Sequence, residues 1–206
     1  MSTGLAPETI PESSPEMRLS FRRALRQQAI DRRLALSPEK YTELSAIICT
    51  LLQTRFPQLS KLRVGFCWPV NNEPDLRLLI QSWIKMNASG FTALLPVVEA
   101  PGKPLAFREW TPASKMAFDR FGIPTPTDGP FIIPEALLIP VNAFDNAGYR
   151  IGYGGGFFDR TLVSINPAPV AIGVGFELSR IDSVHPEPHD VRLNAMVSEA
   201  GVFTFT

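Results

Sequence analysis

Residues 148–160 constrain this chain more than any other segment does. Four of the five residues from 152 to 156 are glycines, so the backbone there can curl tightly and point several N–H groups at one anion. Arg150 precedes these glycines and Asp159 follows them. The arrangement suits a nucleotide, because backbone amides and an arginine bind phosphate while a carboxylate binds the accompanying magnesium.

The glycine segment matches neither of the two common phosphate-binding patterns. No Lys-Ser or Lys-Thr pair follows the glycines, as a P-loop requires. If the dinucleotide pattern is read from Gly152, its last glycine falls on Phe157. A tight turn between a strand and a helix would explain the glycines equally well. Arg150 and Asp159 favour the phosphate interpretation.

The composition predicts one substantial core. The chain has 206 residues, of which 45% are hydrophobic, enough for a single domain that we place at residues 17–206. Residues 1–16 contain three glutamates, three prolines and no basic residue. These features are typical of a disordered tail rather than of a signal or transit peptide.

Charge and cysteine content exclude several classes of protein. Twenty basic and twenty acidic residues balance, which argues against nucleic acid or an anionic membrane as a partner. No apolar run approaches the roughly 18 residues that a membrane-spanning helix needs. Cys49 and Cys67 are expected to be buried free thiols, which places the protein in the cytoplasm.

Apolar periodicity predicts alternating helices and strands. Helices are expected over 17–35, from Pro38 with Ser37 as N-cap, from Pro74, and over 157–164. Short apolar runs predict strands at 62–68, 91–95, 105–110, 136–141 and 170–176. Residues 111–135 are rich in proline and are expected to form an ordered loop. The alternation predicts an α/β sheet covered by helices on both faces.

Two further charged groups are candidates for a phosphate site. Arg22 and Arg26 are four residues apart, so they share one helical face and could both reach a phosphate chain, although a solvated helix surface is the usual explanation. Asp190 ends an extended segment and is either a second magnesium ligand or an acid that caps a turn.

Other side chains indicate less. His185 and His189 have the spacing of a zinc helix, but the two prolines between them forbid that helix. Trp68, Trp110 and Phe157 could stack on a flat heterocycle, although aromatic residues more often belong to the core. We find no Ser-His-Asp or Cys-His arrangement that would indicate a nucleophilic enzyme.

Several motifs in one order resemble the 5-formyltetrahydrofolate cyclo-ligase family, also called methenyltetrahydrofolate synthetases. The resemblance spans residues 22–202. The motifs that carry it lie at residues 22–26, 68–75, 107–112, 120–124, 140–160 and 187–190. The glycine segment and the Phe-Gly-Ile-Pro sequence at 121–124 are the most diagnostic of them.

The resemblance implies both a fold and a reaction. The fold would be a three-layer α/β/α sandwich similar to the NagB/RpiA/CoA-transferase group. The reaction would use ATP and Mg²⁺ to cyclise 5-formyltetrahydrofolate, with or without a polyglutamate chain, to 5,10-methenyltetrahydrofolate, releasing ADP and phosphate. In that scheme the formyl oxygen attacks the γ-phosphorus, N10 closes the ring and phosphate leaves. Phosphoryl transfer needs positioning and charge neutralisation more than a protein nucleophile, which agrees with the lack of a catalytic triad.

The resemblance also assigns roles to residues of this chain. The ATP-binding set would be Arg22, Arg26, Arg150, Gly152, Tyr153, Gly154, Gly155 and Gly156. Asp159 and Asp190 would hold Mg²⁺. The folate pocket would contain Glu73 near the pterin or formyl group, with walls formed by Trp68, Trp110 and Phe157. We expect a monomer or a homodimer.

Three residues depart from the family's pattern. Arg22 stands where lysine is common, which keeps the charge but changes its geometry. Phe157 stands where tyrosine is common, so one hydroxyl is missing, and a neutral hydrogen bond is worth roughly 0.5–1.5 kcal/mol. Leu76 stands where threonine is frequent. A folate- or nucleotide-binding regulatory protein with weakened catalysis is therefore an alternative, and an ATP-independent sugar-phosphate enzyme of the same fold group is a third.

Overall fold

The computed structural model describes residues 15–86 and 90–205. Most of the predicted tail, residues 1–14, lies outside this range. Pro15 and Glu16 form the first turn of α1 (Pro15–Leu34), so this helix begins two residues earlier than expected. The other α-helices are α2 (Pro38–Arg55), α3 (Arg77–Lys85) and α4 (Phe157–Ser164), with 3-10 turns η1 (Pro57–Lys61) and η2 (Glu177–Ser179).

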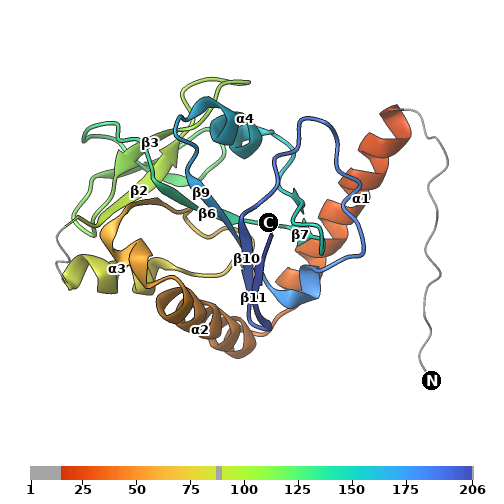
Figure 1. Cartoon of the computed structure of the whole chain (residues 1–206), viewed down its shortest axis with the longest axis horizontal. Coiled ribbons are helices and arrows are strands. Elements are labelled where there is room, and N and C mark those ends of the chain that lie inside the picture. Colours follow the sequence, from red (N-terminus) through yellow and green to blue (C-terminus); the bar gives the residue numbers. More distant parts are fainter. Residues whose placement is uncertain (1–14, 87–89, 206) are drawn as a thin grey trace.

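A seven-stranded sheet forms the centre of the described structure (Figure 1). Its strands are β1 (Arg63–Gly65), β2 (Thr92–Val97), β3 (Ala106–Glu109), β6 (Ala136–Pro140), β9 (Val170–Val174), β10 (Ala195–Ser198) and β11 (Gly201–Thr204). The order is β11-β10-β9-β6-β1-β2-β3, and the five inner strands run parallel. The edge strands β3 and β11 are antiparallel to their neighbours. The inner strands are apolar on both faces because helices cover both.

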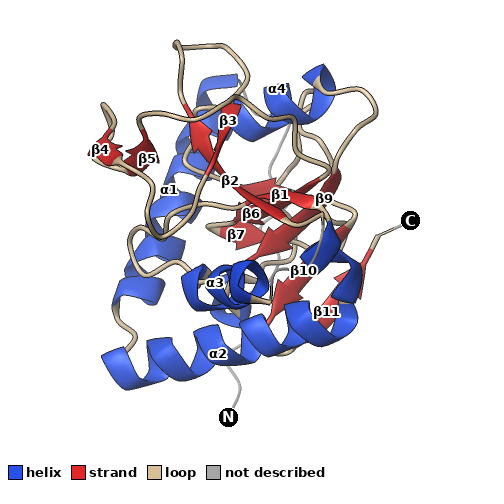
Figure 2. Ribbon diagram, turned by 90° about the vertical axis from the view of Figure 1, so that its left-hand side faces the viewer, coloured by secondary structure: helices blue, strands red, loops and turns tan. Residues whose placement is uncertain are grey.

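Helices cover the two faces of the sheet in separate layers (Figure 2). α2 and α3 pack on one face around a large core cluster that includes Ile48, Ile80 and Trp83. α4 lies over the other face, where Leu162 joins a second cluster. Helix α1 packs beside the sheet through Ala29 in a third, smaller cluster. The predicted three-layer α/β/α fold is confirmed.

Local signals in the sequence set the start of α2 correctly but not the start of α3. Ser37 is the N-cap of α2, where its side chain accepts a hydrogen bond from the backbone N–H of Lys40 at 3.2 Å, and Pro38 opens the first turn. The prediction that a helix starts at Pro74 was wrong. Residues 70–73 form a turn, and α3 starts only at Arg77, whose N–H donates a hydrogen bond to the carboxylate of Asp75.

Other predicted boundaries shifted because tertiary pairing decides them. The run 62–68 yields only the short strand β1, since the chain leaves the sheet after Gly65. The region 111–135 contains a hairpin, β4 (Met116–Phe118) and β5 (Pro124–Pro126), which its prolines hid. We did not predict β10 and β11 either. Within 15–86 and 90–205, no helix is both long and apolar enough to cross a membrane.

Candidate functional site

Three neighbouring strands of the sheet, β1, β6 and β9, end at the same edge. The segments that follow them carry the predicted site: 66–75 after β1, 141–156 after β6 and 175–190 after β9. In parallel α/β sheets, ligands bind beyond the carboxyl ends of the strands. Helix α1 contacts all three segments through arginine side chains. The fold therefore gathers sequence-distant motifs at one edge.

The glycine segment forms a tight connection between the short strand β8 (Arg150–Ile151), which pairs with β7 (Ala143–Phe144), and helix α4. Gly154 and Gly156 have φ angles of 91° and 61°, which favour glycine. Gly156 is the N-cap of α4 and supplies no side-chain cap, so the first N–H groups of the helix stay available to an anion. The segment thus has the positive φ angles that a tight turn requires, and it also leaves N–H groups at the start of α4 that could bind an anion.

Arg26 of α1 lies directly against the glycine segment. Its Nε donates to the carbonyl oxygen of Gly152 at 2.6 Å. A Cβ atom on Gly154 would come within 2.9 Å of Arg26 Nη2, so a side chain at this position would displace the end of the Arg26 side chain, and the φ angle of 91° itself favours glycine. Burial lowers the pKa of Arg26, and the neighbouring charges of Arg22 and Arg23 lower it further. Such an accumulation of positive charge beside free backbone amides favours a phosphate ligand.

Arg22 and Asp190 form a two-pronged ion pair. Arg22 Nη1 donates to Oδ2 at 2.6 Å and Nη2 donates to Oδ1 at 3.2 Å, while the N–H of Glu187 donates to Oδ2 at 2.7 Å. Burial raises the pKa of Asp190, but the hydrogen bonds from Arg22 and from Glu187 outweigh it, so the pKa lies below its usual value. Asp190 is therefore ionised and fully engaged.

Arg150 and Asp159 form a second ion pair, which is hydrogen bonded to the backbone of Val191. Arg150 Nη2 donates to Asp159 Oδ1 at 2.8 Å, and Arg150 Nη1 donates to the carbonyl of Val191 at 2.7 Å. The N–H of Val191 returns a hydrogen bond to Asp159 Oδ1 at 3.0 Å. Since Val191 follows Asp190, the backbone at residues 190–191 joins the two ion pairs that contain the predicted magnesium ligands.

The described residues contain no group of three or more His, Cys, Asp or Glu side chains that could hold a metal alone. Magnesium in nucleotide sites usually takes one or two carboxylates and completes its shell with phosphate oxygens and water. Asp159 and Asp190 match that partial ligand set. Each is already neutralised by an arginine, so metal and phosphate would have to enter together.

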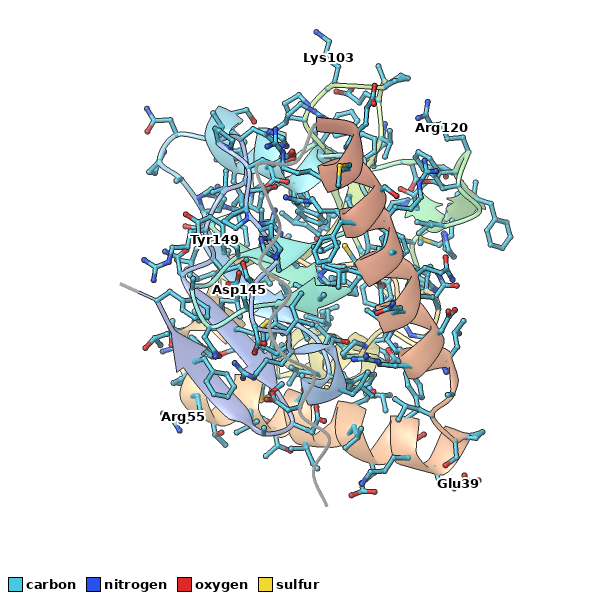
Figure 3. All side chains as sticks on the ribbon, turned by 90° about the vertical axis from the view of Figure 1, so that its right-hand side faces the viewer. Glu39, Arg55, Lys103, Arg120, Asp145 and Tyr149 are labelled. Carbon is cyan, nitrogen blue, oxygen red and sulfur yellow. The ribbon has the colours of Figure 1, made fainter. Side chains whose placement is uncertain are left out.

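Asp145 organises the turn that leads into the glycine segment, and the sequence analysis missed it. The side chain is buried, and Oδ1 accepts from the N–H groups of Ala147 and Tyr149, both at 3.0 Å. Figure 3 shows Asp145 and Tyr149 side by side. Oδ2 accepts from the N–H of Val184 at 3.1 Å and ties the turn to the segment that leads to Asp190. An aspartate followed by Asn-Ala-Gly is a turn signal that could have been read.

Glu73 is a buried acid in the turn after β1. Its side chain is 2% exposed, and Oε2 accepts from the N–H of Val70 at 3.1 Å, while Oε1 is buried without a hydrogen-bond partner. Burial raises its pKa to about 7, and the charge of Arg33 counteracts part of this shift. Burial of a carboxylate is costly, which makes Glu73 a candidate for a functional role.

The aromatic residues predicted for the folate pocket lie in two groups. Trp110 is 4% exposed and belongs to the core, where its ring meets Phe66 and the half-buried Trp68 edge to face. Phe157 starts α4 and packs edge to face with Phe121 of the β4–β5 hairpin, with ring centroids 6.2 Å apart. The structure thus places Trp68 and Phe157 at accessible positions and Trp110 behind Trp68.

Tyr153 and Arg33 connect the glycine segment with the turn that carries Glu73. The hydroxyl of Tyr153 accepts from Arg33 Nη2 at 3.1 Å and from Asn71 Nδ2 at 3.3 Å. We predicted Tyr153 as an ATP residue, but its side chain contacts this turn. Arg33 was missed, although Arg22, Arg26 and Arg33 share one helical face through their spacing of four and seven residues.

The fold and the site together define a three-layer α/β/α protein with an arginine-lined glycine loop at the carboxyl edge of its sheet. Comparison with known proteins narrows the class. The model of the 5-formyltetrahydrofolate cyclo-ligase family matches residues 18–199, and the chain belongs to this family.

Relatives agree with this assignment. The 5-formyltetrahydrofolate cyclo-ligase of Escherichia coli K12 is 30% identical over 181 residues, which cover 84% of this chain and 97% of the relative. The enzyme of the same name from Mycolicibacterium smegmatis is 31% identical over 140 residues, covering 63% and 70% of the two chains.

Solved structures confirm the fold. The 5,10-methenyltetrahydrofolate synthetase of Aquifex aeolicus superimposes with a TM-score of 0.77 at 25% identity, covering 89% of this chain and 92% of the other. The synthetase of Mycoplasma pneumoniae gives a TM-score of 0.70 at 21% identity, with coverage of 86% and 98%.

Proposed function

We propose that this chain uses ATP to cyclise 5-formyltetrahydrofolate to 5,10-methenyltetrahydrofolate, with release of ADP and phosphate. Membership of the cyclo-ligase family supports this reaction. The observation that carries it is the pairing of Arg22 with Asp190 and of Arg150 with Asp159 beside the glycine segment. A site that must bind a polyanion and a cation needs this balance of charges. The monomer or homodimer and the cytoplasmic location stay predictions from the sequence.

On the nucleotide side, the arginines and the glycine segment would bind the phosphates. Arg22, Arg26 and Arg150 would contact phosphate oxygens, and the N–H groups of residues 152–156 and of the first turn of α4 would complete the cradle. Asp159 and Asp190 would then be released to magnesium, which when bound supplies neutralisation of charge on the transferring phosphate. The buried position of Arg150 holds Asp159 in place before ligands arrive.

On the folate side, Glu73 would accept hydrogen bonds from the pterin or formyl region. Trp68 and Phe157 would form walls of the pocket, and Trp110 would act through Trp68, behind which it is packed. Orientation of the formyl oxygen toward the γ-phosphorus is then the main catalytic contribution of the protein. Positioning of this kind needs no protein nucleophile.

The test is a reaction of purified protein with 5-formyltetrahydrofolate, ATP and Mg²⁺, followed through the absorbance of the conjugated methenyl product. We expect product only when ATP is present. Folded protein that binds folate but forms no product would support the regulatory alternative, and product without ATP would support the third.

The magnesium assignment has its own variant. Asp159→Asn keeps an oxygen that can accept the hydrogen bond from Val191 N–H but removes the charge, so magnesium-dependent turnover should fall at least tenfold while folate binding persists. Glu187→Gln is a control, since it changes a carboxylate of the same segment that we assign no ligand role. Wild-type turnover in Asp159→Asn would remove Asp159 from the metal site.

A further inference from the structure

Arg33 is a buried arginine at the junction of three segments. Its side chain is 1% exposed, although it carries a full charge. Nε donates to the carbonyl of Asn71 at 2.6 Å, Nη1 to the carbonyl of Val141 at 3.4 Å and Nη2 to the hydroxyl of Tyr153 at 3.1 Å. One side chain of α1 therefore binds the turn after β1, the segment after β6 and the glycine segment.

These contacts bind the turn at residues 70–73 to α1. Asn71 and Asn72 both have positive φ angles, 48° and 55°, a left-handed conformation that asparagine tolerates better than most residues other than glycine. The side chain of Asn72 donates to the carbonyl of Arg33 at 3.5 Å, so the turn and the helix bind each other in both directions. Glu73 is the last residue of this turn, and its Oε2 accepts a hydrogen bond from the N–H of Val70 in the same turn.

The charges around Glu73 single out Arg33. The groups that face Glu73 are Arg33 from α1, Tyr153 from the glycine segment, Tyr41 from α2 and Cys67 after β1. The pKa values of Tyr41, Tyr153 and Cys67 are all raised, primarily by burial, so these three stay neutral near neutral pH. Arg33 is the one positively charged group in this set. All three of its hydrogen-bond acceptors are uncharged, and its positive charge lowers the pKa of Glu73.

We propose that Arg33 is a positioning residue that couples the folate side of this site to its phosphate side, because its guanidinium binds both the turn that carries Glu73 and Tyr153 of the glycine segment. The proposal rests on the proposed function, which assigns Glu73 to folate and the glycine segment to ATP. The planar fork of arginine suits this task, since it directs donors to separate acceptors at fixed angles. Arg33 itself contacts neither substrate.

The first experiment measures binding of 5-formyltetrahydrofolate without ATP, through quenching of tryptophan fluorescence, as a function of pH. In the wild type, affinity should fall as Glu73 takes up a proton, with a midpoint near its pKa of about 7. Arg33→Met should move this midpoint upward by about one to three pH units, because a buried carboxylate loses the positive charge that lowers its pKa. Arg32→Met is the matched control, since Arg32 is the exposed neighbour on the same helix, and should leave the midpoint unchanged.

Two further variants separate positioning from folding. Arg33→Lys keeps the charge but not the fork, so it should restore the pH midpoint and still raise the KM for ATP several-fold. Tyr153→Phe keeps Arg33 and removes one acceptor, so it should also raise the KM for ATP, with only a small change of the folate midpoint. These two variants test the coupling even if Arg33→Met does not fold.

Opposite results would overturn the coupling. A folded Arg33→Met protein with the wild-type midpoint would exclude an effect of Arg33 on Glu73. Wild-type KM values for ATP in both Arg33→Lys and Tyr153→Phe would exclude a link to the glycine segment. A wild-type protein that binds folate with the expected midpoint but forms no methenyl product would refute the proposed reaction, and the binding experiments would still test the role of Arg33. A wild-type protein that does not bind folate would refute both proposals.

Discussion

Replacing Glu73 by glutamine should make the protein more stable at alkaline pH. Burial raises the pKa of Glu73 from 4.5 in a solvated state to about 7 in the folded protein. Above its unfolded pKa, the unfolded chain releases the proton that the folded chain retains. Stability therefore falls as pH rises from about 4.5 to about 7 and then levels off.

The size of the effect follows from this shift. One pKa unit corresponds to about 1.4 kcal/mol, so between about pH 5 and about pH 8 the ionisation of Glu73 should lower the free energy of unfolding by about 2.5 kcal/mol. Glutamine has nearly the same shape and does not titrate. The Glu73→Gln protein should lack this loss, and the gain over the wild type should be larger at the higher pH.

Urea denaturation of both proteins at the two pH values provides the test. At each pH, the free energy of unfolding of the wild type is subtracted from that of Glu73→Gln, and the value at the lower pH is then subtracted from the value at the higher pH. This double difference cancels the contributions of other titrating groups and any constant cost of the amide. A value near zero would mean that Glu73 titrates like a solvated acid, and the argument from its burial would be refuted. If Glu73→Gln is more stable than the wild type but no longer binds folate, the carboxylate of Glu73 serves function at a cost in stability.

Three further outcomes are expected. Gly154→Ala should raise the KM for ATP at least tenfold, because the new Cβ would lie 2.9 Å from Arg26 Nη2, and the backbone strain should cost about 1–3 kcal/mol. Gly102→Ala is the control, because Gly102 has φ +72° and a Cβ there would meet no heavy atom within 4 Å, so this variant should show similar strain with unchanged kinetics. If the two variants had equal KM values for ATP, the contact of residue 154 with Arg26 would have no effect on ATP binding. Phe157→Tyr should raise kcat/KM about two- to tenfold if the hydroxyl reaches the formyl group, and an unchanged kcat/KM would show that the pocket does not use it. Ser37→Ala should lower the stability by about 1 kcal/mol in thermal denaturation without affecting turnover, and an unchanged Tm would mean that the cap on α2 contributes nothing.

Local chemistry made part of this site predictable. The glycines at 152–156 predict a sharp turn, because the positive φ angles that Gly154 and Gly156 adopt favour glycine, and Arg150 and Asp159 stand close to them along the chain. The two prolines between His185 and His189 predicted an extended segment before Asp190, which was wrong. Residues 187–190 form a turn in which the N–H of Asp190 donates to the carbonyl of Glu187 at 2.9 Å, and Asp190 caps this turn by accepting from the N–H of Glu187, as the alternative interpretation predicted. These conclusions depend on neighbours within a few residues.

Other parts of the site depend on partners far away in the chain. Arg33 looks like an ordinary solvated arginine of α1, yet it lies 38 residues from Asn71 and 120 from Tyr153, to which it is hydrogen bonded. Trp110 was predicted as a pocket wall because aromatic rings suit folate, but packing against Phe66 places it in the core. The spacing of Arg33 from Arg22 and Arg26 places it on their helical face, but no local pattern shows that the fold will bury this arginine, or which tryptophan it will bury.

The sequence by itself determined the alternation of helices and strands, the cap at Ser37, the glycine turn and, through ordered motifs, the family. The tertiary structure alone decided the strand order, the pairing of Arg22 with Asp190 and of Arg150 with Asp159, and the burial of Glu73 beside Arg33. Backbone conformation follows from local sterics and hydrogen bonds. The ionisation of a carboxylate follows from the charges and the solvent around it, and only the assembled fold brings those together.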